Sequence, residues 1–171
     1  MGVQDVLTLP KIVERPMQYY LGIRESVPME GISTMADVNF PSLFRWIGEK
    51  EITRAGAPFF KYNIIDMAGL LELEVGIPLA APVVGDELVV AGILPAGRYA
   101  TLTYTGPYDN LMDANAVLVG WGRERGLVWD VEETFLGDQF GCRLEIYHTD
   151  PAAEPDTAKW VTEVLIRLAD D

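Results

Sequence analysis

The clearest pattern in the chain is a strict alternation of apolar and polar residues near its middle. Over residues 70–79, apolar side chains occupy every second position, while Glu72 and Glu74 fall between them. A period of two is typical of a strand with one buried face. Residues 70–79 are therefore expected to form a strand that packs its leucine, valine and isoleucine side chains on a core.

The same reasoning divides the rest of the chain into further strands and two helices. In the first half we predict a strand over residues 17–25, a helix over 43–50, and strands over 59–66 and 70–79. Ser33–Thr34 and Pro41–Ser42 each offer a start for the helix. In the second half we predict a lead-in strand over 87–91, a strand over 98–105, a helix over 108–125, and strands over 143–148 and 160–168.

Short stretches of the two halves match each other in the same order. Pro16, Tyr20 and Pro28 align with Pro95, Tyr99 and Pro107, and EVGIPLA at 74–80 shares five of seven residues with EVLIRLA at 163–169. Between them, residues 60–63 align with 145–148. Such self-similarity indicates an internal repeat. We expect one domain over residues 1–171, with module one over 9–80, a linker over 81–86 and module two over 87–169.

The repeat predicts an α+β fold of duplicated βαββ modules, related by a pseudo-twofold axis, with antiparallel sheets. A helix covers one face of each sheet. We expect the two bare faces to pack against each other, which leaves a ligand cleft between the modules.

Charge narrows the classes of partner. The net charge is −13, with a pI of about 4.4. A surface of this sign repels nucleic acids and anionic membranes and favours neutral or cationic ligands. Cys142 is the single cysteine, residues 1–6 do not resemble a signal peptide, and no apolar run is long enough to span a bilayer. We expect a soluble cytoplasmic protein, and a homodimer is left open.

One strand carries the most informative side chains. On the strand over 143–148, alternation places Glu145 and Tyr147 on one face and Leu144 and Ile146 on the other, where they suit packing on the helix. The matching positions in the first half are Phe60 and Tyr62. A carboxylate among aromatic rings suits a flat cation. The alternative is that Glu145 is exposed and paired with Arg143 or Lys61.

The sequence lacks the residue patterns typical of nucleophilic catalysis, metal binding and phosphate binding. The single histidine, His148, has no nucleophile elbow to serve, metal-ligand spacing is absent, and no glycine-rich phosphate loop occurs. We expect His148 to be structural, on the face that packs on the helix. We expect no metal and no cofactor.

Two segments resemble GyrI-like domains: residues 94–108, LPAGRYATLTYTGPY, and the E-x-Y … D-P pattern of residues 145–151. The resemblance covers about residues 9–168. It implies paired βαββ modules around a ligand cleft, as in the effector-binding domains of MerR- and AraC-type multidrug-responsive regulators, which also occur alone. It also implies that Glu145 binds cationic aromatic ligands. Further ligand contacts at the helix starts are implied for Tyr108, Phe40 and Phe44.

Three functions follow from the resemblance. The first is a stand-alone binding protein for lipophilic, often cationic aromatic small molecules, for sensing or sequestration. The second is a hydrolase of strained cyclopropane-bearing toxins, with Glu145 as the catalytic residue. The third is an interaction protein that resembles a gyrase inhibitor. No helix-turn-helix is apparent before residue 9, so direct binding to nucleic acid is not expected. Whether the chain is an enzyme stays open, with binding favoured.

Overall fold

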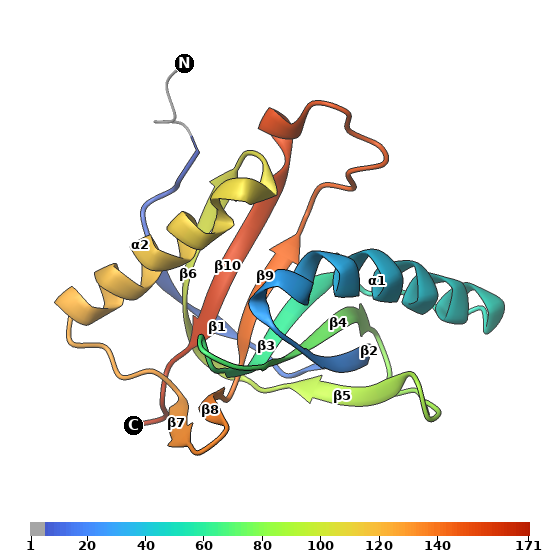
Figure 1. Ribbon diagram of the computed structural model, residues 1–171, viewed down its shortest axis with the longest axis horizontal. Helices are drawn as coiled ribbons and strands as arrows, with labels where there is room; N and C mark the ends of the chain where they lie inside the picture. The colour runs from blue at the N-terminus through green and yellow to red at the C-terminus, as the bar shows by residue number, and fades with distance from the viewer. Residues whose placement is uncertain (1–5) are drawn as a thin grey trace.

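The computed structural model describes residues 6–171. Residues 1–5 lie outside this part, so the expectation about the N-terminal segment over residues 1–6 is not addressed by it. The described chain folds into one strongly curled antiparallel sheet with two helices on the same side (Figure 1). No helix in this part is long and apolar enough to cross a membrane.

The elements of the first half are β1 (Lys11–Arg15), β2 (Gln18–Val27), the 3-10 turn η1 (Met29–Gly31), α1 (Ile32–Glu49), β3 (Phe59–Ile65) and β4 (Leu71–Leu79). Those of the second half are β5 (Val90–Leu94), β6 (Gly97–Thr105), η2 (Tyr108–Asn110), α2 (Leu111–Glu124), β7 (Val131–Thr134), β8 (Gly137–Phe140), β9 (Arg143–Tyr147), η3 (Thr157–Lys159) and β10 (Val161–Arg167). The α+β class and the antiparallel pairing are confirmed. The lead-in strand lies at β5, three residues beyond its predicted start, and β1, β7 and β8 were not predicted.

The two halves meet edge to edge. The strand order is β1-β6-β10-β9-β3-β4-β2-β5, so β9 of the second half pairs with β3 of the first, with Phe60 opposite Glu145. The halves therefore form one continuous sheet and not two separate ones, and their bare faces share one buried cluster inside its curl. Apart from β1, β5 and the β7–β8 hairpin, both halves run strand, helix, strand, strand. Whether this order records a duplication with the boundaries given above stays a prediction.

The face without helices is buried by the curl of the sheet. Its inner cluster is made of side chains that point away from both helices: Tyr20, Phe59, Leu94, Tyr99, Cys142, Leu144, Ile146 and Leu165. Because the sheet wraps around these residues, the bare face buries its apolar surface on itself and needs no second sheet. This is the physical reason why the halves can join through strand edges.

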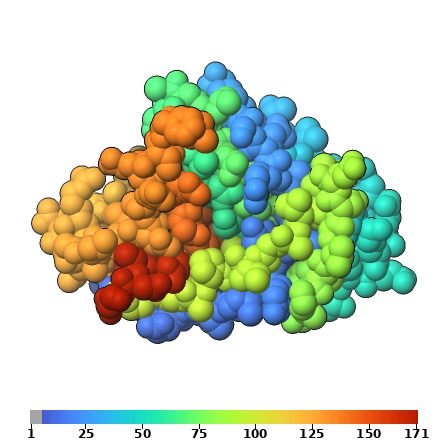
Figure 2. Space-filling model, turned by 90° about the horizontal axis from the view of Figure 1, so that it is seen from below, coloured from blue at the N-terminus to red at the C-terminus, as the bar shows by residue number. Residues whose placement is uncertain are grey.

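The sheet curls at two corners, each between two consecutive strands. β1 leads into β2 through Pro16 and pairs with β6, while β5 leads into β6 through Pro95 and pairs with β2. Each proline lacks a backbone N–H and interrupts the ladder at the corner. Seen from below, the blue residues of β1 and the yellow-green residues of β5 and β6 lie together across the molecule (Figure 2).

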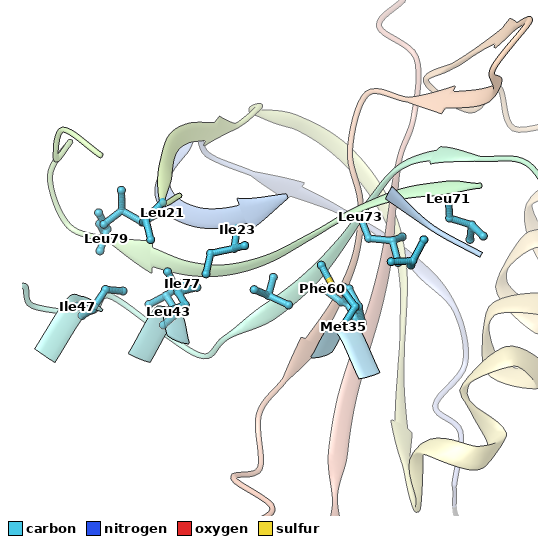
Figure 3. Packing of buried hydrophobic residues seen from close by; sticks show 13 residues of the cluster. Leu21, Ile23, Met35, Leu43, Ile47, Phe60, Leu71, Leu73, Ile77 and Leu79 are labelled. Carbon is cyan, nitrogen blue, oxygen red and sulfur yellow. The ribbon is translucent and has the colours of Figure 1, made fainter. Parts of the chain in front are cut away.

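Helix α1 is much longer than the predicted 43–50. Its buried stripe is Met35, Asn39, Leu43 and Ile47. In Figure 3, Leu43 and Ile47 lie against the strand that carries Ile77 and Leu79. Pro41 lies inside the helix on its exposed side, where the carbonyl that loses its N–H partner can bond to water. The helix therefore does not start at Pro41. It begins at Ile32, directly after Gly31.

Helix α2 begins at Leu111, after the η2 turn, and covers β6 and β10. Its buried residues are Leu111, Ala114, Leu118 and Gly122. Gly126 follows with a φ of +67°, which suits the end of a helix and matches the prediction. The two helices thus cover different halves of one sheet, on either side of the β3–β9 seam (Figure 1).

Candidate functional site

Glu145 lies at the centre of the seam, on the face that both helices cover. Its side chain is only 5% exposed. The prediction had the faces of this strand reversed, because Leu144 and Ile146 point into the inner cluster and not onto a helix. Because the sheet curls, its helix-free face is also buried and apolar. The apolar character of Leu144 and Ile146 therefore does not reveal which face of the strand the helix covers.

Neutral donors hold the Glu145 carboxylate. The Tyr147 hydroxyl donates to Oε1 at 2.8 Å, and the Asn115 amide of α2 donates to Oε2 at 3.0 Å. Within residues 6–171, no Lys, Arg or His nitrogen lies within 4.0 Å of this carboxylate. The alternative of an exposed Glu145 paired with Arg143 or Lys61 is therefore wrong.

Burial shifts the ionisation of this group. Loss of water around Glu145 raises the pKa of its carboxyl above the ordinary value, although hydrogen bonds from Tyr147 and Asn115 and the charge of Arg143 oppose this effect. Burial and the nearby negative charge of Glu145 raise the pKa of Tyr147 and of Tyr62. Both tyrosines consequently stay protonated at neutral pH.

Aromatic rings surround the carboxylate from several elements. Phe60 and Tyr62 of β3 have ring centroids 5.6 Å apart, and Phe40 of α1 meets Phe60 at 6.1 Å and Tyr147 at 6.1 Å. On the other side, Tyr108 lies 5.3 Å from Tyr147. Because Tyr147 packs against the hydrophobic clusters of both helices, it joins the two sides of the shell.

Nearly all of the predicted site residues come together here. Glu145, Tyr147, Phe60, Tyr62, Phe40 and Tyr108 form one continuous group, which we call the Glu145 cluster. Phe44 lies at its margin: it stacks on Phe40 at 6.3 Å, but it is 38% exposed and Arg54 covers its ring. That these residues bind a ligand stays a prediction.

Two neighbours of the cluster were missed as site residues. They are Asn115, which donates to Glu145, and Trp160, neither of which was predicted from the sequence as a site residue. The Trp160 ring lies 4.7 Å from Tyr108, at the outer edge of the cluster. An asparagine beside an apolar helix face is a usable signal, since an amide that loses water needs other partners. Nothing in the local sequence singled out Trp160.

The remaining candidates lie elsewhere. His148 is on the helix-free face, not the predicted one, and its Nε2 lies 3.1 Å from Glu163. Cys142 is buried in the inner cluster. In the described part of the chain, no group of three His, Cys, Asp or Glu side chains is arranged to hold a metal ion.

Neighbouring side chains cover the Glu145 carboxylate in this structure. Surface hollows of about 370 and 400 Å³ lie away from it, one beside Val27 and Met35 and one beside Tyr19 and Val83. Because Glu145 is only 5% exposed, a molecule that contacts its carboxylate must displace side chains that cover it. The aromatic rings around the carboxylate, apart from Phe60, are half-buried: Phe40, Tyr62, Tyr108, Tyr147 and Trp160. Chemically, the cluster offers one negative charge, phenol and amide donors, and aromatic faces.

Several solved structures share the fold. EcmrR in its complex with DNA superposes with a TM-score of 0.76 at 18% identity, covering 97% of this chain and 59% of that one. The chain therefore spans about three fifths of that EcmrR chain. The EcmrR C-terminal domain alone gives 0.70 at 18% identity, covering 95% of this chain and 98% of that one.

Two further structures resemble the chain at lower identity. SAV2435 bound to tetraphenylphosphonium has a TM-score of 0.63 at 8% identity, covering 95% of this chain and 94% of that one. A hydrolase from Listeria innocua has a TM-score of 0.58 at 12% identity, covering 94% and 91%. At such identities these likenesses establish the fold alone.

Family membership rests on the sequence itself. Among curated proteins, no sequence matches the chain significantly. The family described as GyrI-like small molecule binding domain matches residues 9–169, which confirms the resemblance found from the two short motifs. The chain belongs to the GyrI-like small-molecule-binding domain family.

Proposed function

We propose that this domain binds lipophilic organic cations with aromatic groups, and that Glu145 holds the positive charge. The observation that carries the proposal is a buried carboxylate whose direct hydrogen-bond partners are neutral, enclosed by aromatic rings. A ligand cation would supply the counter-charge that the protein does not place within contact distance.

A large, weakly hydrated cation suits this site best. Coulomb attraction to Glu145 is strong where water is excluded, and the faces of Phe60, Tyr62 and Tyr147 add cation–π attraction. A small, strongly hydrated cation loses too much hydration energy on entering such a place. A cation wrapped in aromatic groups loses little, and it replaces displaced protein rings with rings of its own.

The neighbouring structures support the same ligand class. SAV2435 binds tetraphenylphosphonium, a cation that carries four phenyl rings and no hydrogen-bonding group. The net charge of −13 favours approach of cations from solution. The same charge disfavours nucleic acid as a direct partner of this domain.

Calorimetric titration with tetraphenylphosphonium tests the proposal. We expect Glu145→Gln, which keeps the shape and the acceptor oxygen but removes the charge, to weaken binding at least about tenfold. Glu133→Gln on the exposed β7 strand is the matched control, since it makes the same change in net charge away from the cluster. Equal affinities of wild type and Glu145→Gln would remove Glu145 from the site.

A second candidate function is hydrolysis of a strained electrophile. The raised pKa of Glu145 favours it, because a buried carboxyl of this kind suits general acid–base work. Incubation with a cyclopropane-bearing substrate, followed by mass spectrometry, should then show product with the mass of one added water. Stoichiometric binding with unaltered substrate would reject hydrolysis and leave the binding function in place.

A further inference from the structure

Thr162 of β10 carries an unpaired hydroxyl in the interior. Its side chain is 0% exposed, and its Oγ1 has no hydrogen-bond partner among residues 6–171. It is the one buried side-chain nitrogen or oxygen in that part of the chain without a partner. Leaving a buried hydroxyl unsatisfied costs about 1–3 kcal/mol. Such a group calls for a physical reason.

The hydroxyl lies on the Glu145 side of the sheet. Thr162 is directly opposite Tyr147 of β9, and Val164, two residues further along β10, is directly opposite Glu145. Residues that face each other across an antiparallel pair point to the same side. Thr162 is therefore a cross-strand neighbour of the Glu145 cluster, about 7 Å along the strand from the level of the carboxylate.

The neighbouring tyrosines do not engage this hydroxyl. Tyr147 donates to Glu145, and Tyr104, which faces Thr162 from β6, donates to the carbonyl of Pro107 at 2.7 Å. Valine would fill nearly the same volume and suits a strand equally well, without an unpaired polar atom. Packing alone thus gives no reason for a threonine at this position.

We propose that Thr162 is a specificity-determining residue of the ligand site, and that its hydroxyl makes a hydrogen bond to a polar group of the bound cation. This inference rests on the function proposed above. A hydroxyl both donates and accepts, so the matching ligand group is itself a hydroxyl, carbonyl or amine. The preferred ligands are then aromatic cations that carry one such group about 7 Å from the positive centre, and not wholly apolar cations.

Matched phosphonium probes separate the contribution of the Thr162 hydroxyl from that of the Glu145 carboxylate. Tetraphenylphosphonium has no hydrogen-bonding group, whereas the ortho, meta and para isomers of (hydroxyphenyl)triphenylphosphonium each place one hydroxyl at a different distance from the charge. We expect wild type to bind at least one isomer about 2- to 10-fold more tightly than tetraphenylphosphonium. In Thr162→Val this advantage should disappear, while affinity for tetraphenylphosphonium stays within about twofold of wild type. Thr162→Ser, which keeps the hydroxyl, should retain the advantage.

Thermal unfolding of the free protein provides the second readout. Thr162→Val should unfold at the same temperature as wild type or higher, because it removes an unpaired polar group. A clearly lower unfolding temperature would mean that the hydroxyl has a structural partner, such as a buried water, and would overturn the proposal. It would also be overturned if no isomer gains affinity or if the gain persists in Thr162→Val. Loss of the effect of Glu145→Gln on tetraphenylphosphonium would instead reject the underlying binding function.

Discussion

Two carboxylates lie buried on opposite faces of the sheet, and their surroundings differ in kind. Glu74 of β4, 0% exposed, has Lys61 at 3.5 Å and Arg24 at 3.6 Å, and it accepts hydrogen bonds from Asn63 and Tyr20. Its charge is thus matched within the protein. Glu145 receives hydrogen bonds from neutral groups instead. At the scale of single residues, this difference separates a structural carboxylate from one that can bind a ligand.

Removal of the Glu74 carboxylate should destabilise the fold. Glu74→Ala leaves Lys61 without its partner in a largely buried place and deprives Asn63 and Tyr20 of their acceptor. We expect the free energy of unfolding in urea to fall by about 3 kcal/mol. The exposed Glu132→Ala should change it by less than about 0.5 kcal/mol. A similar small change in both variants would show that the Glu74 network is not a stabilising one.

Ligand binding should depend on pH through Glu145. A fixed cation binds the ionised carboxylate, and burial raises the pKa of that group above 4.5 in the free protein. Affinity for tetraphenylphosphonium should therefore rise as pH increases above 4.5, and level off once Glu145 is ionised without ligand. The tyrosines that face Glu145 do not titrate in this range, since Tyr62, Tyr147 and Tyr108 have raised pKa values. Burial lowers the pKa of Arg143, but a guanidinium keeps its charge in proteins.

The difference between wild type and Glu145→Gln is the quantity to measure, because exposed carboxylates also titrate in acid and affect both proteins alike. Calorimetry from pH 4.5 upward would report it. A difference that stays constant with pH would place the titrating group elsewhere.

The sequence predicts part of this site for identifiable reasons. Strand parity places Glu145 beside Tyr147, and the internal match points to Phe60 and Tyr62 as their neighbours across the seam. The contact of Asn115 with Glu145 spans 30 residues and depends on how α2 lies on the sheet. Periodicity within one element carries no information on that placement.

At the scale of elements, the two helices and the turn before α2 position the side chains that cover Glu145. Phe40 comes from the middle of α1, and Tyr108 and Asn115 come from the start of α2 and the turn before it. Close packing fixes α2: a Cβ at Gly122 would lie 2.3 Å from the Trp129 ring, whereas one at Gly120 would meet nothing within 4 Å. The two glycines of the same helix therefore have different roles.

Substitution of these glycines gives opposite predictions. Gly120→Ala should stabilise the protein by about 0.5–1 kcal/mol, because alanine favours a helix interior over glycine. Gly122→Ala gains the same preference, but it must displace the indole of Trp129 and should destabilise the protein by about 1–3 kcal/mol. Urea unfolding of both variants measures this. Stabilisation by Gly122→Ala would mean that Trp129 moves aside freely.

The elements that were predicted and those that were missed differ in their burial. Strands β2, β4, β6 and β10 have long buried patterns that the sequence displays clearly. By contrast, β1 and the β7–β8 hairpin are short and mostly exposed, so selection of apolar residues at alternate positions is weak there. These strands are held by backbone pairing to β6 and β3, which no local pattern reveals.

At the scale of the molecule, the curl of the sheet and the charge of the surface act on the same site. Curling buries the inner cluster and brings β3 and β9 together, and their seam carries Glu145 between the two helices. The net charge of −13 surrounds the cluster with a field that attracts cations. That field is screened by salt, whereas contact with a buried carboxylate is screened much less.

The most direct test compares two ions of one shape and opposite charge. Tetraphenylphosphonium and tetraphenylborate are nearly equal in size and apolar surface, so their affinity ratio reports charge selectivity. We predict that wild type binds the phosphonium at least about a hundredfold more tightly, and that Glu145→Gln reduces this ratio about tenfold or more while Glu133→Gln leaves it unchanged. A ratio that is the same in wild type and Glu145→Gln would contradict the claim that the buried carboxylate selects the ligand.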